Sequence, residues 1–168
     1  MTGEGIPEQT IRKKADKIRS DASAGGYLLN PDQSFVRELV AGICVNEQRY
    51  GYPACPCRLA SGSREEDLDI ICPCDYRDAD LNEFGACYCA LYVSAGIASG
   101  EAQVTCVPER RPSRKERRKE SRSAPVFAGE LPEPVWRCRV CGYLCAREGP
   151  PLVCPICKAS QDRFVRFI

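Results

Sequence analysis

The chain lacks histidine altogether, and its 168 residues include one methionine and one tryptophan. Without histidine there is no imidazole base, no Ser-His or Cys-His nucleophile pair and no His-ligated zinc. Long apolar runs are also missing, since no stretch approaches the ~18 residues that a membrane helix needs, and the first residues lack the basic-then-apolar order of a signal peptide. The sequence therefore predicts a cytoplasmic protein with no membrane partner.

Cysteine, in contrast, is abundant, with 13 residues in the chain. Structural disulfides are rare in a reducing compartment, so this number favours metal ligands and catalytic thiols. The total is odd, and at least one cysteine is left over from any pairing. We expect the chemistry of this protein to be carried by sulfur.

Charge is segregated along the chain. Residues 1–106 hold 10 Lys and Arg against 16 Asp and Glu, whereas residues 107–122 hold 8 against 3. The composition predicts a first domain over 1–106, a basic linker over 107–132 and a second domain over 133–168. The first interpretation of the basic run is a solvated, charged linker, and the second is a docking surface for an acidic electron donor. Nucleic acid is not expected as a partner, because the run lacks interleaved aromatic residues.

Two helices are expected near the N-terminus. Apolar residues recur at helical spacing over residues 8–24, and Gly25-Gly26 supplies a stop. A second helix is predicted to begin with Asn30 as N-cap and Pro31 at its first position and to end near Asn46. Cys44 falls on its apolar side, which indicates a buried, inert thiol.

The last 36 residues are too few to fold on an apolar core alone and need an additional stabilising cross-link. Two Cys-x-x-Cys pairs lie there, at Cys138, Cys141, Cys154 and Cys157. Two such turns can place four thiolates at tetrahedral corners, so the spacing predicts a metal site. Redox-active Cys-x-x-Cys motifs are the rival interpretation, but the surrounding βαβ pattern is missing.

The flanking residues narrow the choice of metal in this unit. Residues 136–143 and 153–159 resemble a rubredoxin, in the short-loop form found at the end of rubrerythrins. The resemblance implies one mononuclear iron, with Trp136, Tyr143 and Phe164 packed beside it. A zinc ribbon is the alternative, and Cys145 lies outside the ligand spacing.

Three Cys-x-Cys pairs occupy the middle of the chain, at Cys55 and Cys57, Cys72 and Cys74, and Cys87 and Cys89. Six thiols exceed by two the four that a single cubane cluster takes. A [4Fe-4S] cluster beside a redox pair accounts for all six, whereas one zinc site leaves two unexplained.

These pairs resemble the Cys-Pro-Cys, Cys-Pro-Cys, Cys-His-Cys signature of the catalytic subunit of ferredoxin–thioredoxin reductase. Residues 50–53 before the first pair and Arg58-Leu59 after it fit the same family, over residues 8–100. A rubredoxin-like tail is similar to that of archaeal-type ferredoxin:disulfide reductases. The resemblance implies a mainly α iron–sulfur domain wrapped around a [4Fe-4S] cluster, plus a small β rubredoxin-like metal domain.

The resemblance also implies roles for the six cysteines. The cluster ligands would be Cys55, Cys72, Cys74 and Cys87. Cys57 would be the exposed nucleophile of the active-site disulfide, and Cys89 the thiol that stays by the cluster. Ferredoxin is then the one-electron donor and a thioredoxin-like protein the substrate, in keeping with the lack of a Gly-x-Gly-x-x-Gly motif for NADPH or flavin.

One position departs from the family pattern, because Tyr88 stands where the family has histidine. A phenol with a pKa of ~10 is no base at neutral pH, although it can donate a hydrogen bond or a proton. We therefore keep Tyr88 as a candidate catalytic residue, with Asp75, Asp78 or Asp80 as possible compensating acids.

The sequence leaves two further functions open. In the first, both iron sites form a non-catalytic electron-transfer carrier and the pair of Cys57 and Cys89 is structural. In the second, the protein binds only zinc and acts in protein interaction. Alkylation of the pair after mild reduction distinguishes the enzyme from the carrier.

Overall fold

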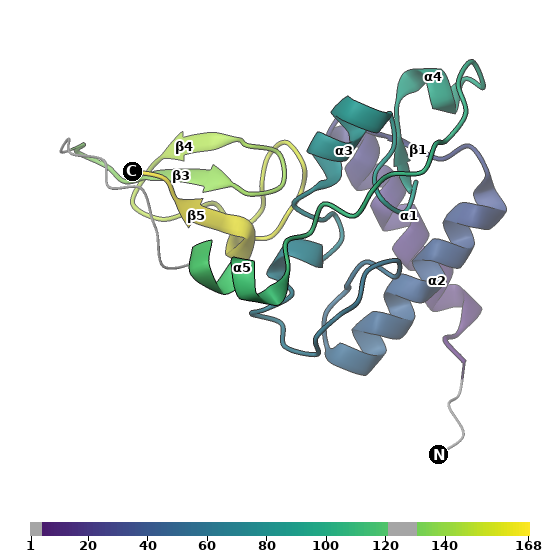
Figure 1. Ribbon diagram of the computed structural model, residues 1–168, viewed down its shortest axis with the longest axis horizontal. Helices are drawn as coiled ribbons and strands as arrows, with labels where there is room; N and C mark the ends of the chain where they lie inside the picture. The colour runs from purple at the N-terminus through teal and green to yellow at the C-terminus, as the bar shows by residue number, and fades with distance from the viewer. Residues whose placement is uncertain (1–4, 121–130) are drawn as a thin grey trace.

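The computed structural model describes residues 5–120 and 131–168 and contains two units with different secondary structure. The helices are α1 (Glu8–Ala24), α2 (Gln33–Tyr50), α3 (Arg77–Phe84), α4 (Ala95–Ala98) and α5 (Arg114–Glu120), with 3-10 turns at Leu68–Ile70 and Gln161–Arg163. The strands are β1 (Leu28–Leu29), β2 (Tyr92–Val93), β3 (Val135–Cys138), β4 (Leu144–Ala146) and β5 (Phe164–Arg166). Helices α1 to α4 lie toward one end of the long axis and the sheet β3 to β5 at the other (Figure 1).

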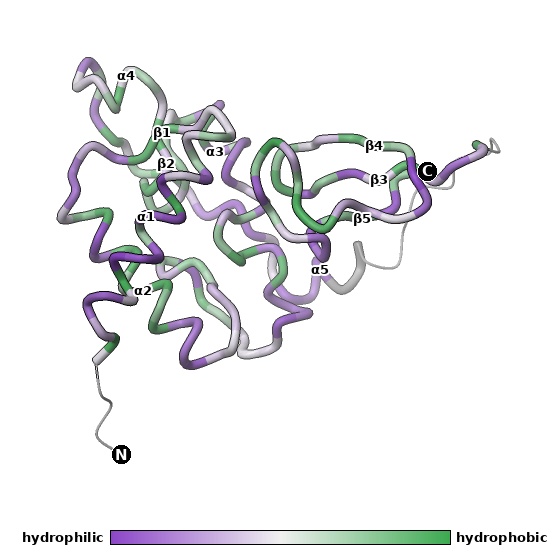
Figure 2. Tube along the Cα trace, turned by 180° about the vertical axis from the view of Figure 1, so that it is seen from behind, coloured by the Kyte–Doolittle hydropathy of each residue, from purple (hydrophilic) through white to green (hydrophobic). Residues whose placement is uncertain are grey.

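Helix α1 packs against α2, and the two form most of the core of the first unit. Hydrophilic and hydrophobic stretches alternate along both helices (Figure 2), as expected for helices with one buried side. Ile11 and Ala22 of α1 share a core with Val40 and Ile43 of α2. The helix predicted over residues 8–24 is confirmed.

The start of α2 differs from the prediction. Asp32, not Asn30, is the N-cap, and its carboxylate accepts hydrogen bonds from the backbone N–H groups of Ser34 and Phe35. The Asn30 side chain is engaged elsewhere, because its amide donates to the Ala90 carbonyl and its oxygen accepts from the Asp32 N–H. Pro31 therefore precedes the helix, which ends at Tyr50 rather than near Asn46.

Helix α2 carries two other features of interest. Cys44 is buried on it, as predicted. Gly51 ends the helix in the left-handed region, with a φ of 81°, and donates its N–H to the Glu47 carbonyl.

Between α2 and α4 the chain is mostly turns, which are held by a few backbone hydrogen bonds. The segment around Ala54 pairs with that around Ile71 in an antiparallel bridge. Strand β2 pairs with β1, so residues 86–93 are fixed against the start of α2. These contacts bring together three loops that are separated along the chain.

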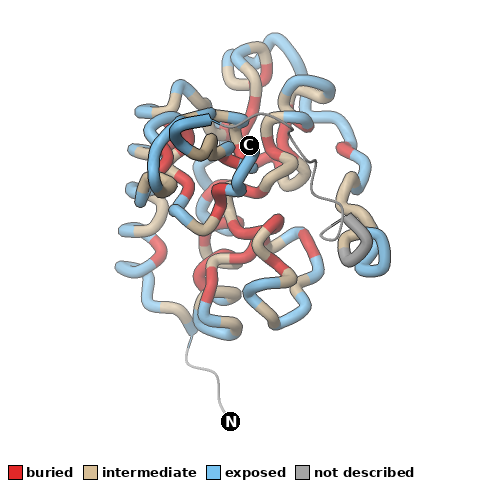
Figure 3. Tube along the Cα trace, turned by 90° about the vertical axis from the view of Figure 1, so that its left-hand side faces the viewer, coloured by how far each residue is buried: buried red, intermediate tan, exposed pale blue. Residues whose placement is uncertain are grey.

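The second unit is a three-stranded antiparallel sheet in the order β4-β3-β5. Trp136 in β3 lies opposite Cys145 of β4 and Arg166 of β5. The predicted combination of a mainly helical unit with a small β unit is confirmed by this arrangement. Buried segments gather in the interior, whereas much of the chain at the periphery is exposed (Figure 3).

The segment predicted as a basic linker, 107–132, falls into two parts. Arg110 pairs with Asp80 and Glu83, and Arg111 pairs with Asp67 and Asp69, so this stretch lies against the first unit. Residues 121–130 lie outside the described residues. No helix in the described parts of the chain is long and apolar enough to cross a membrane.

Candidate functional site

The first two Cys-x-Cys pairs each follow one residue of an antiparallel bridge, between Ala54 and Ile71. The Cys55 N–H donates to the Ile70 carbonyl at 2.8 Å, and the Cys72 N–H donates to the Pro53 carbonyl at 2.9 Å. The turn between Cys55 and Cys57 rests directly on α2 at Gly42. A Cβ atom at Gly42 would lie only 2.7 Å from the Pro56 Cβ, so any larger residue would push the turn away.

The third pair is fixed by β2. The Cys87 N–H donates to the Tyr92 carbonyl at 2.9 Å, and the Tyr92 N–H returns a hydrogen bond to the Cys87 Sγ at 3.3 Å. The chain reverses at Ala90, which has a φ of 52° and donates its N–H to the Cys87 carbonyl. Cys87 and Cys89 therefore point into the same region from one tight loop, with their Sγ atoms 3.8 Å apart.

All six central thiols come together, although the three loops that carry them span 35 residues. The Cys57 thiol contacts both Cys55 and Cys89 through hydrogen bonds. Cys72 interacts electrostatically with three thiols, those of Cys55, Cys74 and Cys87. The six cysteines differ in burial: Cys57 is exposed, Cys72 and Cys89 are half-buried, and the other three are buried.

The burial of these thiols suits ligation of an iron–sulfur group, whose iron ions would take up the thiolate charge. Burial raises the pKa of Cys72 and raises that of Cys74 to about 12, because a lone thiolate is poorly solvated there. A bound metal centre stabilises such thiolates and releases their protons. Cys57 differs, since hydrogen bonds from Cys55 and Cys89 lower its pKa to about 3.

Arg58, the residue after Cys57, is buried between two aromatic rings. Its guanidinium lies 4.6 Å from the ring centre of Tyr76 and 4.4 Å from that of Tyr88. It also pairs with Asp80 and with Glu109. The side chain is completely buried, so the structure holds a fixed positive charge beside the exposed thiol.

The structure places the candidate proton donors among cations. The Tyr88 ring lies beneath Arg58, and its role as a catalytic residue stays a prediction. Asp75 pairs with Arg163 and Arg139, Asp78 with Arg77, and Asp80 with Arg58 and Arg110. Each of these three carboxylates is therefore engaged in an ion pair.

The four cysteines of the second unit form a compact cluster. Their Sγ atoms lie within 4.8 Å of one another, and this is the metal-ligating group found among the described residues: Cys138, Cys141, Cys154 and Cys157. Two of the distances, from Cys138 to Cys157 and from Cys141 to Cys154, are 3.6 Å. Metal–sulfur bonds of about 2.3 Å in a tetrahedron put sulfurs about 3.8 Å apart, so the thiols fit a single ion.

Two matched turns build this second site. The Gly142 N–H donates to the Cys138 carbonyl, and the Lys158 N–H donates to the Cys154 carbonyl in the corresponding position. Both Gly142 and Lys158 have positive φ, 77° and 61°. The predicted packing is also confirmed, because Trp136, Tyr143 and Phe164 belong to the core around the cysteines. Cys145 packs against the same core and lies outside the ligand set.

The two units meet at the loop that carries the second Cys-x-Cys pair. The Arg163 side chain is 1 % exposed, donates to the Ile71 carbonyl at 2.9 Å and pairs with Asp75. On the other side, a Cβ atom at Gly25 would lie 2.5 Å from the Ile156 carbonyl oxygen. The metal loop of the second unit therefore sits directly on the end of α1, beside Cys72.

Tyr27 connects the cores of the two units. Its ring packs against the apolar clusters around both sets of cysteines and meets the Tyr92 ring edge-on, with the centres 6.2 Å apart. The Arg77 guanidinium lies 3.6 Å from the centre of the Tyr27 ring and 5.2 Å from that of Tyr92. Sequence reasoning missed this contact, since Tyr27 lies in a turn without any motif.

Together these features define a protein with two groups of thiols, four that can hold a metal ion and six that three loops bring together. The family model of the ferredoxin thioredoxin reductase catalytic beta chain matches residues 7–119, and the chain belongs to this family. Residues 136–165 match the rubredoxin-like domain of rubrerythrin.

A curated relative supports the same assignment. The chain is 32% identical over 76 residues to the catalytic chain of ferredoxin-thioredoxin reductase from Cyanidium caldarium. The match covers 44% of this chain and 65% of that relative. The chain therefore spans just under two-thirds of the length of this curated relative.

Proposed function

We propose that the protein is an iron–sulfur disulfide reductase, in which Cys57 and Cys89 form the redox-active pair. Membership of the reductase family supports the reaction class. The observation that carries the proposal is the position of the pair: the exposed Cys57 thiol contacts Cys89, whose Sγ lies 3.8 Å from that of Cys87. One thiol is thus open to a substrate while the other remains among the buried thiols.

The remaining central thiols are the ligands in this proposal: Cys55, Cys72, Cys74 and Cys87. Their burial and mutual proximity suit a [4Fe-4S] cluster, which supplies electrons one at a time. In the second unit Cys138, Cys141, Cys154 and Cys157 would hold one iron, with zinc as the alternative.

The chain's own thiols carry out the exchange. The Cys57 thiolate attacks one sulfur of the substrate disulfide, so a mixed disulfide forms and the second substrate sulfur leaves as a thiolate. Cys89 then attacks the Cys57 sulfur, which releases the first substrate sulfur and leaves a disulfide between Cys57 and Cys89. These exchanges conserve electrons, and two electrons and two protons from outside restore the pair. Hydrogen bonds with Cys55 and Cys89 and, to a lesser extent, the Arg58 charge lower the pKa of Cys57 and favour its thiolate.

Ferredoxin is the proposed one-electron donor and a thioredoxin-like protein the proposed substrate. Both are named in the description of the family and of the Cyanidium relative. The exposure of Cys57 suits a protein substrate, because a disulfide on a protein surface reaches only an accessible thiol.

The rubredoxin-like unit is proposed to pass electrons to the first centre. Support comes from its docking beside Cys72 and from the continuous contact through Tyr27, Arg77 and Tyr92. Tyr92 in turn donates its N–H to the Cys87 Sγ. These contacts connect the surroundings of the two sets of thiols through three adjacent side chains.

The test of this function is a comparison of three anaerobically loaded proteins: wild type, Cys57→Ser and Cys106→Ser. We expect Cys57→Ser to lose disulfide reduction by at least ~10³-fold while keeping its iron and sulfide, because the nucleophile is gone and the ligands remain. Cys106 is exposed and outside the site, so Cys106→Ser should match wild type.

Alkylation completes the test. After mild reduction, Cys57 of the wild type should label quickly and Cys89 slowly. Equal inertness of both thiols, together with unchanged turnover in Cys57→Ser, would show an electron carrier instead.

A further inference from the structure

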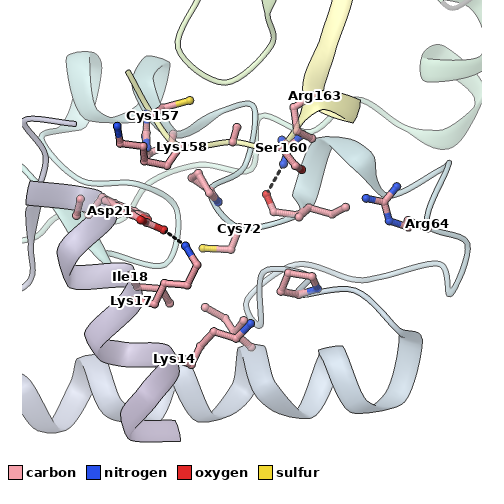
Figure 4. A pocket seen from close by; sticks show the side chains of 18 residues that line it. Lys14, Lys17, Ile18, Asp21, Arg64, Cys72, Cys157, Lys158, Ser160 and Arg163 are labelled. Atoms are coloured by element: carbon pink, nitrogen blue, oxygen red, sulfur yellow. Dashed lines mark hydrogen bonds and ion pairs between the residues drawn. The ribbon is translucent and has the colours of Figure 1, made fainter. Parts of the chain in front are cut away.

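A cavity of about 270 Å³ lies between the two units. Helix α1, the loop at Cys72 and the loop that begins at Cys157 surround it, and the Cys72 side chain extends toward its middle (Figure 4). The cavity thus adjoins one cysteine of each metal centre. Neither the family match nor the proposed reaction assigns it a role.

Most of the charged side chains on the wall of this cavity are basic. Six of them line it: Lys14, Lys17, Arg64, Arg77, Lys158 and Arg163. Asp21 is the one carboxylate among the lining residues, where it pairs with Lys17. The carboxylates that pair with the other cations, such as Glu47 and Asp162, lie outside the lining. The surface presented to a ligand is therefore rich in hydrogen-bond donors and poor in acceptors.

Two deep arginines retain unused donors. Arg77 and Arg163 are each 1 % exposed, and both line the cavity. The Arg77 Nη2 and the Arg163 Nε have no hydrogen-bond partner among the described residues. A buried N–H group without an acceptor is costly, so the two arginines retain donor capacity at the edge of the cavity, although these two atoms are themselves shielded from solvent.

Lys158 gives an independent indication. Its φ of 61° lies in the left-handed region, where the matched turn of the same site uses Gly142. A lysine here is conformationally unfavourable compared with glycine, yet it adds a basic residue to the lining of the cavity. Its hydrogen bond is to the Pro155 carbonyl, so the charge is not neutralised by a carboxylate there.

We propose that this cavity binds a small oxyanion of the phosphate or pyrophosphate class. Its oxygens would accept hydrogen bonds from the lysines that line the cavity, with the deep arginines adding positive charge behind them, and its charge would lie between Cys72 and Cys157. Added negative charge beside both centres disfavours their reduced forms. Binding should therefore lower the midpoint potential of each centre, whatever substrate the protein reduces.

The experiment uses the anaerobically loaded full chain and calorimetric titration with sodium pyrophosphate or inorganic phosphate, at an ionic strength held constant with sodium chloride. We expect one saturable site per chain. Lys158→Gly should weaken binding about tenfold, the loss of one charged hydrogen bond. This variant also relieves the strained turn, so it should fold at least as well as wild type.

A matched pair of variants on α1 distinguishes binding in the cavity from general attraction to positive surface charge. Lys17→Gln removes a lining cation and should weaken binding, whereas Lys13→Gln removes an exposed cation outside the lining and should leave it unchanged. Equal binding by all variants, or no saturation beyond the chloride control, means an adventitious ion only and overturns the proposal. Because binding is measured without turnover, the outcome is separate from that of the reductase test.

Discussion

The two centres use the same ligand atom but are built in different ways. In the second unit four cysteines from two matched turns use all their sulfurs on one site. In the first unit three loops bring six cysteines together, and one of these, Cys57, remains exposed. Four cysteines that are all ligands suit a site that only holds a metal ion. Two further cysteines next to the ligands suit a site that also carries out thiol–disulfide exchange.

The surroundings of the two centres differ as well. The second unit has a small core of cysteines and aromatic residues, so we expect its fold to depend on a bound metal. The first unit has a helical core and, in addition, buried carboxylates that arginines neutralise, among them Asp67 and Asp80. Loss of metal should therefore unfold the second unit but leave much of the first unit intact.

The largest expected effect comes from removing a ligand of the second site. In Cys154→Ser, we expect loss of one metal ion per chain and unfolding of residues 133–168, since a structural metal site contributes about 10–16 kcal/mol. Trp136 is the one tryptophan and lies in β3, so its fluorescence reports this unit alone. Cys145→Ser is the matched control and should keep the metal. Unchanged fluorescence in Cys154→Ser would contradict the comparison.

A second prediction concerns the junction between the units. Arg163→Met removes the ion pair between Arg163 and the buried Asp75. Breaking a buried pair costs about 3–5 kcal/mol of unfolding free energy. Arg64→Met removes the exposed pair with Asp162 at the same junction and should cost at most ~1 kcal/mol. Urea unfolding followed by Trp136 fluorescence measures both. Similar losses in the two variants would show that burial of Arg163 is not what fastens the units.

Local patterns in the sequence are sufficient to predict some features of this structure. The apolar spacing of α1 and the Cys-x-x-Cys spacing of the second unit depend on residues close together in the chain, and the structure has both features. The start of α2 was predicted wrongly because Asn30 has a tertiary partner, the Ala90 carbonyl, 60 residues away. A local capping preference cannot reveal such a competing contact.

The junction and the cavity were outside the reach of sequence reasoning for the same reason. Arg163 and Asp75 are 88 residues apart, and nothing in the composition pairs them. The basic run was read as linker charge, although Arg111 bonds carboxylates more than 40 residues upstream. Opposite charges in a sequence indicate possible partners, but only the fold decides which of them meet.

The third prediction uses pH to test the ion pair between Arg111 and the buried Asp67 in the first unit. Burial raises the pKa of Asp67, but hydrogen bonds from Tyr52, Arg111 and Ser61 outweigh it and hold the pKa below its usual value. A lowered folded pKa contributes stability above the unfolded pKa of ~3.9, and this stability is lost as pH falls through the folded pKa. In Arg111→Met the deficit in unfolding free energy should therefore grow as pH rises from 3 to 6.

We expect this deficit to reach roughly 2 kcal/mol at pH 6, the size of a charged hydrogen bond. Chemical unfolding at several pH values measures it. Arg114→Met provides the control, because Arg114 pairs with Glu66 on the exposed surface and should cost under ~1 kcal/mol. A deficit for Arg111→Met that does not change with pH would exclude Asp67 as its cause.

The smallest expected effect is at Tyr88, where the residue before Cys89 departs from the family's histidine. The ring supports the Arg58 guanidinium, and a phenylalanine ring can do the same. Tyr88→Phe should therefore keep turnover within about twofold, whereas Tyr88→Ala removes the support and should lower it about tenfold, as for loss of a buried cation–π contact. Steady-state reduction of a thioredoxin-like disulfide measures both variants. A tenfold loss in Tyr88→Phe would assign the hydroxyl a direct part in proton transfer and make the first centre, unlike the second, dependent on a group other than sulfur.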